Sequence, residues 1–314
     1  MERTQSTQYK SKSLWVTLVY FVLSFYYFGV IMMTYFVNYP ALSNIHEHTK
    51  AVMDIFNNRM MIGCYIPSIL LVGAAIGMYL FSPTIFPRRI ILVSVILIII
   101  SVVTTIFFIV PIQLAFSATG LTEAVQHKLL PISLALQIMP AALNVLIVLF
   151  LLNMYVRDVK LIGKWLFIIV FALNFYTVGT NYVEAIVNYS YWGSIGSNDW
   201  LAFRFSGGKF FQTFLIPAFL PFLLIVPLFW LRPKAIPKSF ILVFWLAQLW
   251  IFITTSVYFV PKIQLPLNHA FSINLIEDLN RYDFILRGTA GLVLNFITGW
   301  MLLKIGLQNL KVKE

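Results

Sequence analysis

The chain has 314 residues, of which 60% are hydrophobic and 11% charged, against roughly 25% charged residues in ordinary soluble domains. This composition and the mean hydropathy of +0.87 exclude a freely soluble enzyme and a disordered chain. The apolar residues are gathered in runs of about twenty, the length at which a helix crosses the hydrocarbon of a bilayer. We therefore expect an all-α, multi-pass membrane protein.

Eight apolar runs predict eight transmembrane helices, at 14–36, 60–81, 90–110, 130–154, 163–187, 211–231, 239–260 and 282–306. An even number of spans places both termini on one side of the membrane. That side collects the entire net charge of +11, while the opposite side is neutral, so the positive-inside rule makes the terminal side cytoplasmic. Topology thus explains the basic charge, and we expect the cytoplasmic (inner) membrane as location and no nucleic-acid partner.

The two halves of the chain repeat each other at a spacing of 150 residues. Identical residues at this spacing include Trp15 and Trp165, Phe25 and Phe175, Tyr26 and Tyr176, Gly29 and Gly179, Val37-Asn38-Tyr39 and Val187-Asn188-Tyr189, and Ile66-Pro67 and Ile216-Pro217. A shift of one residue then aligns Asn144 with Asn295. Each unit holds four spans, so the copies must be parallel. We predict two tandem four-helix membrane bundles, over residues 1–158 and 159–314.

Most of the remaining polarity lies in the outer loops, at about 40–60, 111–129, 188–210 and 261–281, where loops can carry function. Three histidines there, His46, His48 and His127, are weak candidates for a metal site. Residues two apart do not share a helical face and no familiar ligand spacing occurs, so solvated loop histidines are the favoured interpretation. No cofactor motif is found either, and we expect neither metal nor cofactor.

Glycine pairs in the second and eighth spans allow helices to approach closely. Gly73 and Gly77 form a Gly-xxx-Gly pair, and Gly288 and Gly291 place small residues on the eighth span. Packing within one chain is the favoured interpretation. A homodimer or a partner in a membrane complex is the alternative.

The fifth span carries a polar stripe on one helical face, with spacings of three and four residues. Its members are Asn174, Thr177, Asn181, Glu184 and Asn188, and the less polar equivalents in the first span are Ser24, Tyr27, Ile31, Thr34 and Asn38. Polar groups in hydrocarbon are costly unless they are paired or line a cavity, so the stripe should face the bundle interior. It either hydrogen-bonds neighbouring helices or lines a site for a ligand or ion. Glu184 is a candidate proton carrier.

The eighth span begins with Asp283 and Arg287, which lie four residues apart on one face and can form an ion pair. The pair either stabilises the helix start or holds an arginine that orients a carboxylate, phenolate or quinone oxygen. The first half has Ile132 and Leu136 at the equivalent places. The second half is therefore the better equipped for a polar site.

Several short motifs resemble the anthrone-oxygenase-like family of small four-helix integral membrane proteins. They are Tyr27-Phe28-Gly29, Val37-Asn38-Tyr39-Pro40-Ala41-Leu42, Val110-Pro111-Ile112-Gln113, Val260-Pro261 and the segment from Asp283 to Arg287. The resemblance implies oxidation of a reduced polycyclic phenol to a quinone by dioxygen, without metal or flavin. In that chemistry Glu184 would be the base, Arg287 and Asn188 would be hydrogen-bond donors, and the aromatic residues would form an apolar site.

The sequence thus favours an outward-facing polar and aromatic pocket that binds or oxidises a small hydrophobic, phenol- or quinone-like molecule. The predicted catalytic residues are Glu184, Arg287 and Asp283, and the predicted substrate-binding residues are Asn38, Asn174, Asn181, Asn188 and Tyr176. Two other classes of protein remain open. One is a transporter of a small molecule or ion, and the other is a structural or assembly subunit of a membrane complex.

Overall fold

The computed structural model describes residues 2–119, 123–157, 160–206 and 208–311, and within these ranges it contains helices and no strands. The boundary predicted between the two halves, at residues 158 and 159, lies outside the described residues. By length and composition, seven helices of 29 to 37 residues can cross a membrane. They are Lys12–Leu42, Thr49–Phe81, Arg88–Phe116, His127–Tyr155, Leu161–Trp192, Lys238–Leu267 and Ile273–Asn309. The fold is that of a multi-pass membrane protein.

Most spans consist of α-helical segments joined by a π-helical turn. In the first half these are α1 Glu2–Met33, η1 Thr34–Asn38, α2 Tyr39–Leu42, α3 Thr49–Met60, η2 Met61–Tyr65, α4 Ile66–Phe81, α5 Arg88–Thr104, η3 Thr105–Ile109, α6 Val110–Thr119, α7 Glu123–Ile132, η4 Ser133–Ile138 and α8 Met139–Tyr155. In the second half they are α9 Leu161–Asn181, η5 Tyr182–Asn188, α10 Tyr189–Trp192, α11 Ser197–Phe205, η6 Phe211–Leu215, α12 Ile216–Leu224, α13 Leu228–Leu231, α14 Lys238–Thr254, η7 Thr255–Gln264, α15 Leu265–Leu267, α16 Ile273–Asp283, η8 Phe284–Gly288 and α17 Thr289–Lys311.

Two expectations drawn from hydropathy are wrong. The segments expected as outer loops are largely helical, because α3, α6, α11 and α16 continue or adjoin the spans. At 1.5 Å per residue the spans are about 44–56 Å long, against about 30 Å of hydrocarbon. The sixth span is not one continuous helix. It contains Pro221 and Pro227, and the chain turns between α12 and α13, which leaves a shorter apolar helix at Phe211–Leu224.

Eight π-helical turns occur among the described residues, one in each span. In six of them a proline lies within the turn or among the first two residues after it, namely Pro40, Pro67, Pro111, Pro140, Pro217 and Pro261. Proline has no N–H to donate to the preceding turn, so the regular hydrogen-bond ladder is interrupted there. Such turns are rare in proteins, and those that do occur are often found at functional sites.

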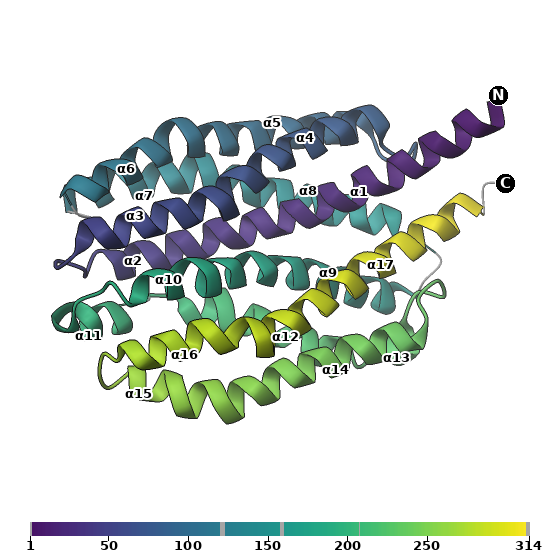
Figure 1. The fold of residues 1–314 in the computed structure, drawn as a ribbon. Coiled ribbons are helices and arrows are strands. Elements are labelled where there is room, and N and C mark those ends of the chain that lie inside the picture. The colour runs from purple at the N-terminus through teal and green to yellow at the C-terminus, as the bar shows by residue number, and fades with distance from the viewer. Residues whose placement is uncertain (1, 120–122, 158–159, 207, 312–314) are drawn as a thin grey trace.

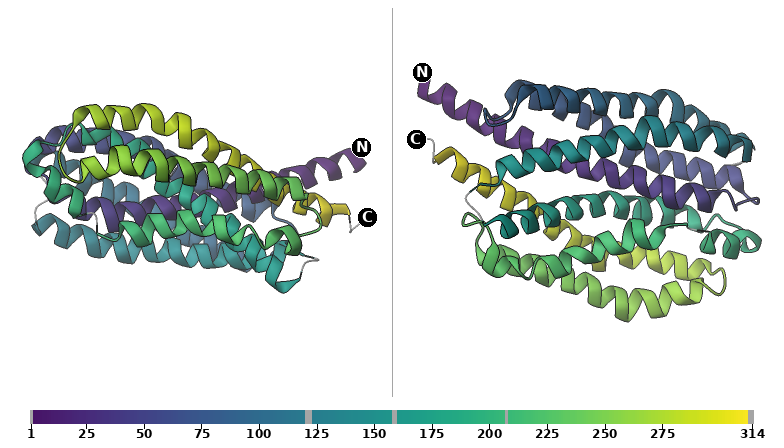
Figure 2. Two further views of the ribbon diagram at one scale, coloured as in Figure 1. Left: turned by 90° about the horizontal axis from the view of Figure 1, so that it is seen from below. Right: turned by 180° about the vertical axis from the view of Figure 1, so that it is seen from behind.

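The spans form one elongated bundle in which α1 and α9 run side by side through the centre (Figure 1). On one side lie α4, α5 and α8, and on the other lie α12, α14 and α17 (Figure 2). The described ends of α1 and α17 lie at the same end of the bundle (Figure 1). We call the opposite end, where α2, α3, α10 and α16 lie, the distal end.

Close approach of α1 and α9 depends on two glycines 150 residues apart. A Cβ atom on Gly29 would lie 3.0 Å from the carbonyl carbon of Tyr176, and one on Gly179 would lie 2.9 Å from the backbone nitrogen of Val30. These distances are too short for any other residue. Small residues at such crossings let membrane helices gain van der Waals contact.

Candidate functional site

The only polar stripe residue with a carboxylate, Glu184, is buried in the distal part of the bundle, with 5% of its surface exposed. The amide of Asn188 donates a 2.7 Å hydrogen bond to Glu184 Oε2. Asn188 also exchanges hydrogen bonds with Asn38, at 2.9 and 3.2 Å, and Tyr191 donates to its oxygen at 3.2 Å. Glu184 is thereby fixed to the contact between the two halves.

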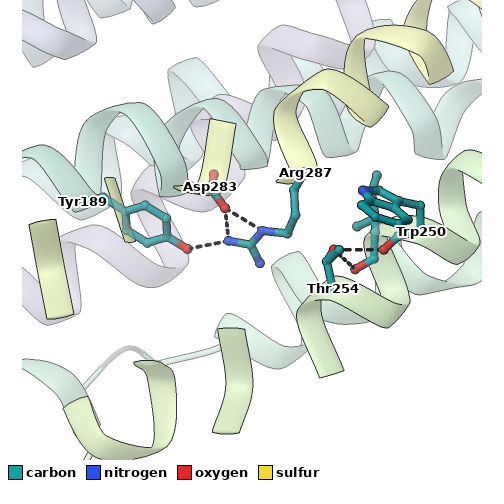
Figure 3. A network of polar contacts seen from close by, with 6 residues as sticks. Tyr189, Trp250, Thr254, Asp283 and Arg287 are labelled. Carbon is teal, nitrogen blue, oxygen red and sulfur yellow. Dashed lines mark hydrogen bonds and ion pairs between the residues drawn. The ribbon is translucent and has the colours of Figure 1, made fainter. Parts of the chain in front are cut away.

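The predicted pair of Asp283 and Arg287 is present, as Figure 3 shows. Arg287 Nε donates to Asp283 Oδ1 at 2.5 Å, and the same guanidinium forms an ion pair with that oxygen. A second nitrogen of Arg287 donates to the hydroxyl of Tyr189 at 3.4 Å, and the guanidinium carbon lies 4.0 Å from the ring centroid of Phe259. The cation therefore has an acidic, a phenolic and an aromatic neighbour.

Arg204 belongs to the same cluster but was not among the predicted site residues. It lies on α11 and donates at 2.8 Å to the side-chain oxygen of Asn268 and also to that of Gln264. Its guanidinium carbon lies 4.7 Å from the ring centroid of Trp192. Burial lowers the pKa of the Arg204 guanidinium, while the charge of Glu184 acts to raise it. The only signal for it in the sequence is an arginine between two spans.

The structure thus gathers two guanidinium groups and two carboxylates at the distal end of the second half. Arg204 and Arg287 both act electrostatically on Glu184, and Asp283 acts on it with the opposite sign. Asp283 is paired with Arg287, whereas the hydrogen bond found for Glu184 comes from a neutral amide. We call Glu184, Arg204, Asp283 and Arg287 the charged cluster. It can bind an oxygen atom through guanidinium donors and hold a proton on Glu184.

The other predicted substrate-binding residues lie apart from this cluster. Asn174 donates to Asn295 of α17 at 3.1 Å, ten residues or about 15 Å before Glu184 along the helix. Tyr176 donates to the carbonyl oxygen of Thr213 at 2.9 Å, and so joins α9 to the neighbouring span. Asn181 is exposed, in contrast to the buried stripe residues Asn174, Glu184 and Asn188.

The three candidate metal ligands are not brought together. His46, His48 and His127 are all exposed. Among the residues that the structure describes, no three or more His, Cys, Asp or Glu side chains are grouped so that they could hold a metal ion. The segment before α3 has a different role. The backbone N–H groups of His46 and Glu47 donate to Asp199 at 2.7 and 2.6 Å, which ties the two halves together at the distal end.

The corresponding part of the first half is neutral. Gln113 donates to the hydroxyl of Tyr39 at 2.9 Å and accepts from Tyr65 at 2.5 Å. Thr34, which is buried, stands 150 residues before Glu184. Among these described residues, the charged side chains in the interior at the distal end thus belong to the second half.

The fold and the cluster together define a multi-pass membrane protein with buried and half-buried ionisable residues at one end of its bundle. No protein-family model, no curated protein and no solved structure matches the chain. Its function is therefore inferred from the geometry of the charged cluster.

Proposed function

We propose that the protein binds a small hydrophobic molecule with a phenol- or quinone-type oxygen at the charged cluster. The observation that carries this proposal is the gathering of four charged side chains in one half of the bundle, with Glu184 and Asp283 buried and Arg204 and Arg287 half-buried. Removing charges from water costs several kcal/mol per ion, so charged side chains inside membrane proteins are rare and usually serve function. The neutral network of the first half shows that the fold itself does not require these charges.

Three members of the cluster, Arg287, Asp283 and Glu184, have distinct parts in the proposed chemistry. Arg287, oriented by Asp283, supplies N–H donors to an oxygen that gains negative charge. Glu184 accepts a proton from an activated carbon or phenol. The family resemblance extends the proposal from binding to oxidation of the bound molecule, in which a CH2 group between phenol rings becomes C=O. Dioxygen is the oxidant, one of its oxygen atoms enters the product and the other leaves as water.

We also propose that the chain is a tandem duplication with both termini in the cytoplasm, so that the charged cluster faces outward. Contacts at equivalent positions support the duplication. Tyr26 donates to the carbonyl oxygen of Gly63 at 2.6 Å, and Tyr176 donates to that of Thr213 at 2.9 Å. The two donors are 150 residues apart in the sequence, and so are the two acceptors. Asn38 and Asn188, at the same spacing, bond to each other.

The test is to purify the full chain in mild detergent and titrate it with a tailless benzoquinone and with an anthrone. Arg287→Gln should weaken quinone binding about 10- to 150-fold, since a hydrogen bond to a charged group contributes about 1.5–3 kcal/mol. Glu184→Gln should retain binding but consume no oxygen with the anthrone. The matched control is Gln113→Asn in the first half, which should behave as wild type.

Equal quinone affinity in wild type and Arg287→Gln would overturn the proposal that the quinone binds at the charged cluster. Unchanged oxygen consumption in Glu184→Gln would overturn its role as base.

A further inference from the structure

The interior of the first half is filled by the stripe on α1. Tyr20, Ser24, Tyr27 and Ile31 are each at most 2% exposed. The two phenols bond across the bundle. Tyr20 donates to Asn144 at 3.0 Å, and Tyr27 lies 3.0 Å from the hydroxyls of Ser101 and Thr105. Nothing can enter this interior without displacing those rings.

The equivalent stripe on α9 fills its interior less completely. At the position of Tyr27 stands Thr177, which is half-buried, and at the position of Ile31 stands Asn181, which is exposed. Both lie between Asn174, which reaches α17, and Glu184. A threonine thus stands where the first half has a buried phenol ring, and the side chains at these two positions are less buried than Tyr27 and Ile31.

Helix α14 shows the same difference from its counterpart α5. Val95, Ile98 and Val102 on α5 are 8%, 2% and 4% exposed. The residues 150 positions later are Trp245 and Gln248, both half-buried, and Phe252, which is 43% exposed. A buried aliphatic seam in the first half is thus replaced by partly exposed aromatic and polar side chains in the second.

Open space also borders α17. A Cβ atom built on Gly291 would meet no atom within 4 Å, although this glycine is half-buried. Asn295, one turn further along the same face, is half-buried as well. With the one-residue shift, their counterparts are Pro140 and Asn144, which are both buried. On three helices of the second half, α9, α14 and α17, these positions are thus less buried than their counterparts in the first half.

The boundary between α12 and α14 is formed by flat aromatic rings. Phe222 of α12 stacks on Trp245 and Phe252 of α14, with centroids 5.9 and 6.0 Å apart and interplanar angles of 14° and 12°. Helix α14 lies at the outer edge of the bundle, away from α1 (Figure 1), and α12 packs against both α9 and α14. Rings stacked in this way can part by rotation without breaking hydrogen bonds. We call these three residues the aromatic seam.

From these contacts we infer that the ligand is a chain-bearing amphiphile of the bilayer, a phenol or quinone with a long alkyl or isoprenoid tail. Its head occupies the polar interior of the second half beneath Glu184 and Arg287, and its tail leaves through the aromatic seam into lipid. The interior offers Thr177, Asn181 and Gln248 to a polar head, and the seam offers only ring surface to a tail. This inference rests on the proposed function and specifies its substrate class and entry route.

The experiment uses the full chain in lipid nanodiscs with two quinones of the same head group, one tailless and one with a decyl tail that carries a diazirine. Thr177→Tyr, which restores the first-half residue, should weaken binding of both quinones at least tenfold. Gly291→Leu, which fills open space, should act like Thr177→Tyr. Its control is Gly73→Leu on α4, where an added Cβ also meets nothing and the residue is exposed.

On irradiation, the tailed quinone should label peptides that contain Phe222, Trp245 or Phe252 more than any peptide of α4 or α5. Labelling spread evenly over the lipid-facing helices would overturn the seam. Normal binding in both Thr177→Tyr and Gly291→Leu, with loss in Arg287→Gln, would overturn the inference and leave the proposed function intact. If neither quinone binds the wild-type protein, both are overturned.

Discussion

Replacing Gly179 by alanine is expected to force apart the two central helices. The new Cβ would lie 2.9 Å from the backbone nitrogen of Val30 and 3.0 Å from the carbonyl carbon of Tyr26, whereas ordinary contacts of a Cβ begin near 3.4 Å. The neighbours are backbone atoms and cannot rotate away, and the carbonyl oxygen of Tyr26 would lie closer still, so α1 and α9 must separate by about 1 Å or more. Overpacking of this kind costs about 1–3 kcal/mol, or about a 5- to 150-fold change in the unfolding equilibrium.

Unfolding in mixtures of mild detergent and SDS, followed by circular dichroism, measures this change. Gly73→Ala provides the control, because an added Cβ there meets no atom within 4 Å and alanine is the better helix former. Its stability should equal or slightly exceed that of wild type. If Gly179→Ala unfolds at the same SDS fraction as Gly73→Ala, close helix approach does not stabilise the centre of the protein.

Two further predictions concern contacts between the halves. Asp199→Ala removes the acceptor of the N–H groups of His46 and Glu47. It should lower the free energy of unfolding by about 1.5–3 kcal/mol, the contribution of hydrogen bonds to a charged group. Asp199→Asn keeps an acceptor oxygen and should recover part of this loss. Wild-type stability in the alanine variant would contradict the prediction. A double-mutant cycle with Asn38→Leu and Asn188→Leu should give a coupling of about 0.6–1.7 kcal/mol, as for hydrogen bonds inside membranes, and strict additivity would show that their bond contributes nothing.

Hydropathy predicted where helices cross the membrane, but not where they end. The segments Thr49–Met60 and Ile273–Asp283 are polar enough to be taken as loops, yet they continue their spans as helices. A hydropathy average identifies the residues that lie in the hydrocarbon of the bilayer. It does not show that the backbone hydrogen bonds of the helix continue into the more polar residues beyond. The break after Leu224 was missed for the converse reason, because the residues around Pro221 and Pro227 remain apolar throughout.

The candidate site was predictable where its contacts are local. Glu184 with Asn188, and Asp283 with Arg287, are four residues apart on one helix, so spacing alone pairs them. Arg204 was not predictable, because it reaches Gln264 and Asn268 only when two segments about 60 residues apart in the sequence fold together. The repeat indicated that Asn38 and Asn188 are equivalent, but equivalence does not tell whether two residues touch.

The bond between Asn38 and Asn188 also has a consequence for the order of biosynthesis. The first span enters the bilayer when the fifth has not yet been made, since 150 residues separate the two amides. Until then the amide of Asn38 lacks its native partner, and an unsatisfied amide in an apolar medium is costly. The central interface therefore cannot close before the fifth span has been made. The first half matures only when the ribosome has delivered residues that belong to the second.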